Sequence, residues 1–238
     1  MTHRRGAVVV HGLTGSTESV AGVATALAAA GFEVEAPLLP GHGTSPEELA
    51  GCAWDDWAAA VEEAFAAVAR RAARVVAVGL SMGGALSAAL AASHDGAVAG
   101  LATVNPIIDP PAPSFQDLLG RLLDAGEHFL PGIGGDLADP HAEERAYDRL
   151  PVAALRSMGE GLHGLRPRLG EVRCPVLILT SRHDHVVPIV SSDVLAGAVG
   201  GPVERVWLER SHHVATLDLE RDEVERRIVA FAERVTAG

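Results

Sequence analysis

Residues 74–92 read RVVAVGLSMGGALSAALAA and contain the sharpest local signal in the chain. Val75–Val78 is an apolar run rich in β-branched residues, typical of a strand buried on both faces of a parallel sheet. Residues 84–92 are small and apolar on nearly every side, which predicts a helix packed closely against its neighbours. Between them lies the sequence Gly79-Leu80-Ser81-Met82-Gly83. A G-x-S-x-G motif between a strand and a helix predicts a sharp turn that lifts the Ser81 hydroxyl out of the sheet.

Similar apolar runs recur along the chain, with helical patterns between them. Two helical stripes of apolar residues are clear: Trp57, Val61, Phe65 and Val68, and Val224, Ile228, Phe231 and Val235. Such alternation predicts an α/β fold, with a mostly parallel sheet of about six or seven strands flanked by helices. The expected strands cover residues 6–10, 32–36, 74–79, 97–104, 175–180 and 203–208.

The alternation stops between Asn105 and Val172, where no convincing strand is found. This stretch opens with Pro106-Ile107-Ile108-Asp109-Pro110-Pro111, which excludes a helix interior or a central strand. We expect residues 1–105 and 173–238 to form the α/β core and residues 106–172 to form a helical cap. Ligands of open α/β sheets bind beyond the carboxyl ends of the strands, so an insertion leaving from a strand end would cover that site.

Composition excludes several classes of function. The 238 residues suit one domain with an insertion, and 31 acidic against 19 basic residues give a net charge of −12. This balance argues against nucleic acid as a partner and against binding to an anionic membrane surface. All the basic residues are arginine. The chain therefore has neither a lysine for a Schiff base nor the lysine of a phosphate-binding loop.

The N-terminus and the cysteines bear on location. The apolar run after Met1–Arg5 is short and ends at His11-Gly12, which does not suit a signal peptide. No run approaches the roughly 20 apolar residues of a membrane span. Cys52 and Cys174 are far apart and form no C-x-x-C pair, which argues against a disulfide framework or a thiolate zinc site. We therefore expect a cytoplasmic protein without stable membrane insertion.

A serine becomes a useful nucleophile only when a base takes its proton, so the chain must supply a histidine and an orienting acid. The expected order along the chain is Ser, Asp, His. Asp184 directly follows the predicted strand 175–180, and His212 and His213 follow the strand 203–208. All three positions would lie at the carboxyl edge of the sheet, together with Ser81.

Several motifs in order along the chain resemble those of the α/β-hydrolase superfamily, and in particular of the small bacterial carboxylesterases and monoacylglycerol lipases. They are Val10-His11-Gly12-Leu13-Thr14-Gly15, Pro40-Gly41-His42-Gly43, Gly79-Leu80-Ser81-Met82-Gly83-Gly84, Asp184-His185-Val186-Val187-Pro188 and Ser211-His212-His213-Val214-Ala215-Thr216-Leu217-Asp218. The resemblance implies Ser81, Asp184 and His213 as a catalytic triad. Relatives often carry glycine where His212 stands, and His212 remains the alternative base.

An oxyanion hole needs two backbone donors. One is expected to be the N–H of Met82, and the resemblance implies the N–H of Leu13 as the other, with His11 bracing its loop. The resemblance also makes Glu144 a candidate contact for glycerol hydroxyls. Candidate residues of the substrate pocket are Ile107, Ile133, Glu144 and Val186, and further apolar candidates for an acyl channel are Ile108, Phe115, Leu137, Leu155, Met158, Leu162 and Leu165.

We expect a hydrolase of short- to medium-chain esters, including monoacylglycerols, with a small-molecule ester as its partner and no metal or organic cofactor. The same triad would also serve a thioesterase or a carbon–carbon bond hydrolase, and hydrolase folds can act as non-catalytic ligand receptors. A metallohydrolase using Asp184 with His183, His185 and His212 or His213 is a further alternative. It lacks the usual HxHxDH or HExxH pattern and leaves the Ser81 turn unexplained.

Overall fold

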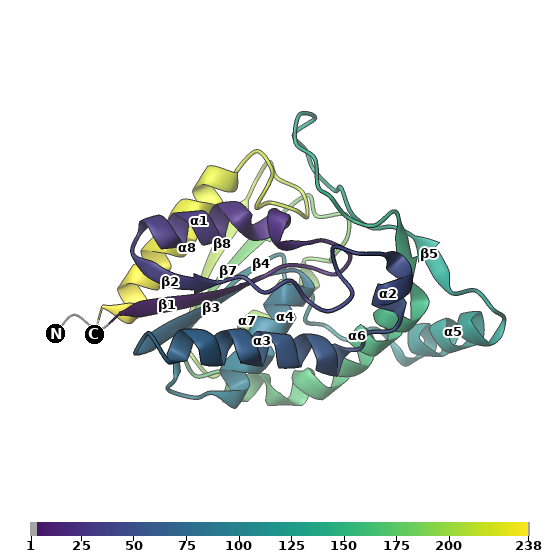
Figure 1. Cartoon of the computed structure of the whole chain (residues 1–238), viewed down its shortest axis with the longest axis horizontal. Helices are drawn as coiled ribbons and strands as arrows, with labels where there is room; N and C mark the ends of the chain where they lie inside the picture. The colour runs from purple at the N-terminus through teal and green to yellow at the C-terminus, as the bar shows by residue number, and fades with distance from the viewer. Residues whose placement is uncertain (1–3, 238) are drawn as a thin grey trace.

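The computed structural model describes residues 4–237, so Met1–His3, the start of the N-terminal segment that does not suit a signal peptide, lie outside it. Its centre is a parallel six-stranded sheet in the order β2-β1-β3-β4-β7-β8 (Figure 1). This confirms the predicted mostly parallel sheet. The strands are β1 (Arg5–Val10), β2 (Phe32–Glu35), β3 (Arg74–Leu80), β4 (Val98–Val104), β7 (Val176–Ser181) and β8 (Val203–Leu208).

Side chains point alternately to the two faces of the sheet along each strand, and helices cover both faces. Ala7 and Val9 of β1 face the core under the helices α1 (Ala21–Ala29) and α8 (Arg221–Thr236). Val8 and Val10 face the opposite core, under α3 (Trp54–Ala69) and α4 (Met82–Ser93). Figure 1 shows these two helical layers on either side of the strands. The shorter helices are η1 (Thr17–Val20), α2 (Pro46–Ala50) and α7 (Val190–Ala198).

The two predicted stripes explain how the long helices pack. All four apolar residues of the stripe on α3 are buried, and Trp57 is completely covered. On α8, the stripe from Val224 to Phe231 is buried against the sheet, and Val235 is half-buried. Within residues 4–237, none of the helices has both the length and the apolar character needed to cross a membrane.

Residues 106–172 begin at the carboxyl end of β4, and by Arg168 they have reached the last residue of α4, Ser93, to whose Oγ the guanidinium donates a hydrogen bond. They contain α5 (Pro113–Asp124), β5 (Phe129–Pro131), β6 (Arg149–Pro151), α6 (Val152–Leu165) and η2 (Arg166–Glu171). The prediction that this stretch holds no strand is wrong, because β5 and β6 form a short antiparallel pair. Three residues are too few to show an alternating pattern, and the prolines at the ends of the pair hide it further.

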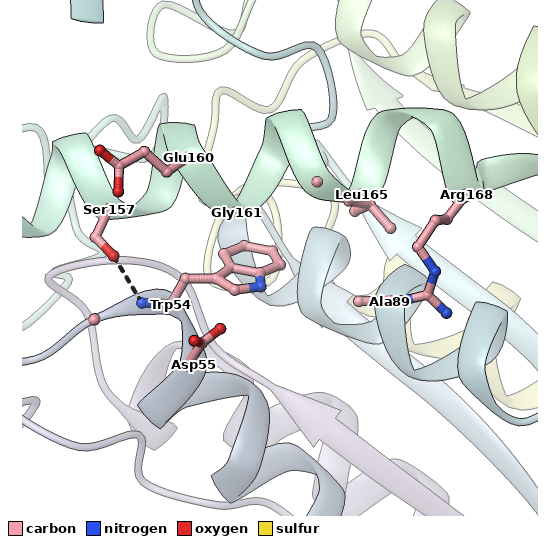
Figure 2. Close-up of a pocket in the computed structure, with 10 residues that line it drawn as sticks. Trp54, Asp55, Ala89, Ser157, Glu160, Gly161, Leu165 and Arg168 are labelled. Carbon is pink, nitrogen blue, oxygen red and sulfur yellow. Dashed lines mark hydrogen bonds between the residues drawn. The ribbon is translucent and has the colours of Figure 1, made fainter.

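The helix α6 is anchored to the core at the start of α3 (Figure 2). The backbone N–H of Trp54 donates a hydrogen bond to Ser157 Oγ over 3.0 Å, and the Trp54 indole lies against Gly161. An added Cβ on Gly161 would overlap the indole ring, so only glycine allows this approach. A cleft of about 510 Å³ opens beside this contact, lined by Glu160, Arg168 and others, on a different part of the surface from Ser81.

We expect Gly161→Ala to destabilise the protein by about 1–3 kcal/mol, because the added methyl group overpacks the contact with Trp54. Gly164→Ala on the same helix is the matched control. Within residues 4–237, an added Cβ there would have no atom within 4 Å apart from the neighbouring residues and the backbone of the helix itself, so the alanine should leave stability unchanged or raise it by up to about 1 kcal/mol. Urea unfolding measures both variants. Equal destabilisation by the two would contradict the packing argument.

Candidate active site

Ser81 occupies the tight turn between β3 and α4. It is the N-cap of α4 and has φ 54° and ψ −119°, a conformation that non-glycine residues rarely adopt. A Cβ on Gly79 would overlap the backbone of Gly83, and a Cβ on Gly83 would overlap the backbone of Val10. The two glycines of the motif are therefore required by space. The predicted turn is present, and it presents the serine at the carboxyl edge of the sheet.

Two backbone hydrogen bonds hold the strained turn. The N–H of Ser81 donates to the carbonyl of Val104 at the end of β4, over 3.0 Å. The carbonyl of Ser81 accepts from the N–H of Ile107 over 3.3 Å. The turn is thus tied both to the neighbouring strand and to the first residues of the 106–172 stretch.

His213 and Asp184 form a buried pair. His213 Nδ1 lies 2.8 Å from Asp184 Oδ2, and the exposed fractions of the two side chains are 8% and 2%. The other carboxylate oxygen, Oδ1, accepts the backbone N–H groups of Val186 and Val187 over 2.8 and 2.7 Å. These bonds fix the carboxylate so that it accepts a hydrogen bond from Nδ1–H, which leaves Nε2 on the far side of the ring as a proton acceptor.

Ser81 and His213 line the same narrow crevice, together with Leu13, Ile133 and Glu144. The crevice has a volume of about 20 Å³, which is little more than a single water molecule needs. Its roof comes from the loop between β5 and β6, residues 132–148, hereafter the 132–148 loop. An ester large enough to react at Ser81 would have to displace this roof.

The two predicted oxyanion donors flank the crevice. Met82 is the first residue of α4, where backbone N–H groups lack partners within the helix. Leu13 lies on the loop after β1, and Gly12 beside it packs against Ser81, since an added Cβ there would come within 3.3 Å of the Ser81 Cβ. Both backbone segments are therefore next to the serine.

Buried histidines brace the Leu13 loop. The N–H of Leu39 donates to His11 Nε2 over 3.1 Å, so Nδ1 carries the proton and donates to the carbonyl of Gly12 over 2.9 Å. The His42 ring meets the His11 ring edge to face, with centroids 4.9 Å apart. Burial, and secondarily the neighbouring His42, lower the pKa of His11 to about 3, so this imidazole stays neutral.

Other substrate candidates fall into three groups. Ile133 and Glu144 line the crevice, whereas Ile107, Phe115, Leu155 and Met158 line a separate apolar groove of about 440 Å³ beside it. Val186 lines neither, because its neighbour Val187 takes the place on the groove wall. The remaining apolar candidates pack elsewhere: Ile108 and Leu162 are fully buried, Leu137 packs on the core under α1 and α8, and Leu165 lies at the cleft of Figure 2.

Sequence reasoning missed Asn105, which clamps the loop that carries His213. Asn105 follows β4 with φ 44° and is buried. Its amide donates to the carbonyls of His212 and His213 over 3.2 and 2.8 Å and to Ser181 Oγ over 2.9 Å, while its oxygen accepts the N–H of Ser181 over 2.7 Å. The sequence feature that could have identified Asn105 is its position directly after the predicted strand 97–104 and before Pro106.

Asp218 joins the same loop to the 132–148 loop. Its carboxylate accepts the backbone N–H groups of His212, Ala138, Asp139 and Leu219 over 2.7–2.9 Å. Burial opposes ionisation of this carboxyl group, but the four donors outweigh it and hold its pKa below the ordinary value. Asp218 closes the last of the resemblance motifs, although sequence reasoning assigned it no role.

Asp136 was also missed, and it contacts both loops that carry the acid and the base. Its Oδ2 accepts the backbone N–H groups of His185 and His213, each over 3.1 Å. Burial by itself would raise the pKa of this carboxyl group. The hydrogen bond from the His185 ring and those from the backbone N–H groups lower the pKa by more than burial raises it, so the net shift is downward. The metallohydrolase alternative had grouped His185 and His212 with Asp184, yet Asp184 pairs with His213 and the other two histidines face Asp136.

A parallel sheet with a serine on a strained strand-to-helix turn and a His–Asp pair beside it defines an α/β-hydrolase. The family model described as "Serine aminopeptidase, S33" matches residues 2–220, and the chain belongs to this family. It is 35% identical to the thermostable monoacylglycerol lipase of Bacillus sp. strain H-257 over 229 residues, which are 95% of this chain and 89% of that protein. It is 25% identical to a carboxylesterase of Bacillus subtilis strain 168 over 231 residues, 96% and 92% of the two chains.

Solved structures agree with this assignment. A structure from the work on LipS and LipT, two metagenome-derived lipolytic enzymes, superposes with a TM-score of 0.92 at 36% identity. It covers 98% of this chain and 94% of its own. Monoacylglycerol lipase from Paleococcus ferrophilus superposes with a TM-score of 0.79 at 19% identity, over 96% and 94% of the two chains, and supports the fold alone.

The depressed pKa of His11 predicts a loss of stability in mild acid. The unfolded chain binds a proton at this histidine below pH 6.5, while the folded protein resists it down to about pH 3. The free energy of unfolding therefore falls as pH drops from 6.5, by up to about 1.4 kcal/mol per unit for this group. His42, whose pKa burial also lowers, adds to the same slope.

Urea unfolding between pH 6.5 and 4.5 measures this slope above the range where most carboxylates titrate. His11→Gln should unfold more readily at neutral pH and show a shallower dependence on pH, since its share of the slope is gone. The exposed residue His141 provides the control, and His141→Gln should keep the slope of the unmodified protein. An unchanged slope in His11→Gln would contradict the assignment.

Proposed function

We propose that this chain is a serine hydrolase that cleaves carboxylic esters of short- to medium-chain acyl groups, including monoacylglycerols. The observation that carries the proposal is the convergence of Ser81 on its strained turn with the His213–Asp184 pair at one crevice. The relatives named as a monoacylglycerol lipase and a carboxylesterase support ester hydrolysis as the reaction.

In the proposed mechanism, His213 Nε2 takes the proton of the Ser81 hydroxyl as Oγ attacks the ester carbonyl carbon. The carbonyl oxygen becomes an oxyanion, stabilised by the N–H groups of Leu13 and Met82. Asp184 stabilises the imidazolium through Nδ1–H. The C–O bond to the alcohol then breaks, and the alcohol leaves with the proton from His213. Water, deprotonated by His213, hydrolyses the acyl-enzyme and regenerates Ser81.

The groove of about 440 Å³ is the proposed acyl site. Its lining is mostly apolar and includes Ile107, Phe115, Leu155 and Met158. The backbone bond from Ile107 to Ser81 places one end of the groove beside the nucleophile. A volume of this size suits one small ligand, and an apolar wall stabilises a hydrocarbon chain by removing it from water.

Glu144 is the proposed contact for the alcohol part. Its Oε2 accepts the N–H of Gly135 over 2.8 Å, which orients the carboxylate on the wall of the crevice. A carboxylate accepts hydrogen bonds strongly, so the free hydroxyl groups of a glycerol ester are suitable donors. The apolar groove and this acceptor belong to two different pockets, which would receive the two ends of a monoacylglycerol.

A role in lipid metabolism follows from this substrate class. We propose that the reaction takes place in the cytoplasm, because Cys52 and Cys174 are both free thiols, which agrees with a reducing compartment. The proposed substrate is the small-molecule ester itself, and every step of the mechanism uses groups of this chain and water.

Loss of the nucleophile tests the reaction. We expect Ser81→Ala to lower kcat on p-nitrophenyl butyrate by roughly 10⁴–10⁶-fold and to abolish labelling by a fluorophosphonate. Ser87→Ala is the matched control, because Ser87 is a buried serine of α4 with no assigned role. This variant should keep both its turnover of the ester and its labelling by the fluorophosphonate. His213→Gln should be as inactive as Ser81→Ala, whereas His212→Gln should retain turnover. Labelling and turnover that persist in Ser81→Ala would exclude the mechanism.

The headgroup contact has its own test. Glu144→Gln should raise KM for a medium-chain monoacylglycerol while changing KM for the p-nitrophenyl ester of the same acyl chain little, since only the first substrate offers hydroxyl groups. The exposed neighbour Glu143 provides the control, and Glu143→Gln should leave both values unchanged. Equal effects on the two substrates would show that Glu144 shapes the loop and does not bind the alcohol.

A further inference from the structure

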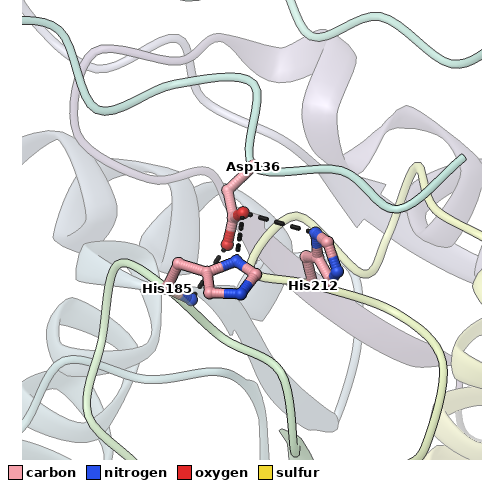
Figure 3. Close-up of side chains that lie close together, drawn as sticks. All are labelled: Asp136, His185 and His212. Carbon is pink, nitrogen blue, oxygen red and sulfur yellow. Dashed lines mark hydrogen bonds and ion pairs between the residues drawn. The ribbon is translucent and has the colours of Figure 1, made fainter. Parts of the chain in front are cut away.

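Three segments distant in sequence bring one carboxylate and two imidazoles together above the sheet (Figure 3). Asp136 comes from the 132–148 loop, His185 from the loop after β7 and His212 from the loop after β8. Asp136 Oδ1 lies 2.8 Å from His185 Nδ1 and 3.4 Å from His212 Nδ1. The three atoms all lie within 4.8 Å of one another.

The two oxygens of Asp136 have different surroundings. Oδ2 is occupied by the backbone N–H groups of His185 and His213, which hold the carboxylate in a fixed orientation. Oδ1 faces the two imidazole nitrogens. The exposed fraction of the side chain is 15% for Asp136, 26% for His212 and 62% for His185. The cluster is therefore mostly buried at Asp136 and open to solvent at His185.

We propose that Asp136, His185 and His212 bind a divalent transition-metal ion of the Zn²⁺ type. Zinc bonds of about 2.0–2.2 Å to nitrogen and oxygen place tetrahedral ligand atoms about 3.3–3.5 Å apart. The 3.4 Å separation of Asp136 Oδ1 and His212 Nδ1 already has this value. The shorter separation to His185 needs to open by about 0.5 Å, and His185 is the exposed member that can move. Water from the open side would supply the fourth ligand.

The donor set favours this class of ion. Imidazole suits zinc and its neighbours in the transition series, whereas magnesium prefers oxygen ligands alone. On binding, each Nδ1 gives its lone pair to the ion in place of its contact with Asp136, and its proton resides on Nε2. The site is separate from the proposed chemistry at Ser81, because Asp184 is paired with His213 and does not belong to the cluster.

An ion at this position would inhibit ester hydrolysis, a consequence that rests on the proposed function. The 132–148 loop supplies Ile133 and Glu144 to the roof of a crevice of about 20 Å³, which an ester cannot enter without moving the roof. Asp136 lies on the same loop, and its metal-bound partners lie next to Asp184 and His213 in sequence. Metal bonds would therefore pin the closed roof to both catalytic loops.

The binding test uses the full chain and zinc chloride in a buffer without chelator, measured by isothermal titration calorimetry. We expect one zinc ion per chain. His185→Gln and Asp136→Asn should each weaken binding at least tenfold, and circular dichroism shows whether these variants are folded. His183→Gln is the matched control, because His183 is an exposed histidine two residues from His185 and outside the cluster. It should bind zinc like the unmodified protein.

The functional test follows hydrolysis of p-nitrophenyl butyrate. Zinc should lower turnover in parallel with occupancy, EDTA should restore it, and His185→Gln should resist zinc, while magnesium has no effect. Zinc binding that is absent, or equally tight in His185→Gln and Asp136→Asn, would overturn the site. Zinc binding at the cluster without loss of turnover would contradict the inference that the bound ion inhibits ester hydrolysis. The calorimetric result does not depend on activity, so a chain inactive on every ester would refute the proposed function and leave the metal site to be judged separately.

Discussion

The geometry of this site depends on a close approach of backbone to backbone at the start of α4. Ser81 holds a φ of 54°, and no side chain fits at Gly79 or Gly83 without overlapping main-chain atoms. A strained residue of this kind costs on the order of 1–3 kcal/mol and persists only where the surroundings hold it. Here α4 provides that support, because ten of its twelve residues are buried between the sheet and its neighbours. The buried helix and the bond to Val104 keep the serine raised from the sheet.

Around this turn, the loops that carry Asp184 and His213 are held by side chains that accept or donate backbone hydrogen bonds. Asn105 holds the carbonyls of His212 and His213, and Asp136 and Asp218 accept N–H groups from the same loop. These polar ties, together with the burial of Val214 and Ala215 in the core, fix where the imidazole lies. Asp136 and Asp218 also belong to, or contact, the 132–148 loop. The position of the base and the closure of the roof are therefore mechanically linked.

This link gives the roof a double role. It lines the crevice beside Ser81 through Ile133 and Glu144, and it meets the loop of His213 through the carboxylate of Asp136. Excluding water strengthens electrostatic interactions inside a site, but the same cover must open for substrate. The loop is held by hydrogen bonds and by the packing of Leu137 on the core under α1 and α8, and both must give way when it opens. A metal ion at Asp136 would alter that balance, because coordination bonds replace hydrogen bonds.

The sequence by itself determined the layered α/β fold, the turn at Ser81 and the placement of Asp184 and His213 after their strands. These features follow from local rules: apolar runs form buried strands, small residues allow a close helix, and only glycine fits at positions 79 and 83 beside Ser81. Only the tertiary structure decided the partners of Asn105, Asp136 and Asp218, the pairing of β5 with β6, and which apolar residues line the groove. The physical reason is that these contacts join segments up to 108 residues apart through single hydrogen bonds and short pairings, which leave no periodic pattern in the chain.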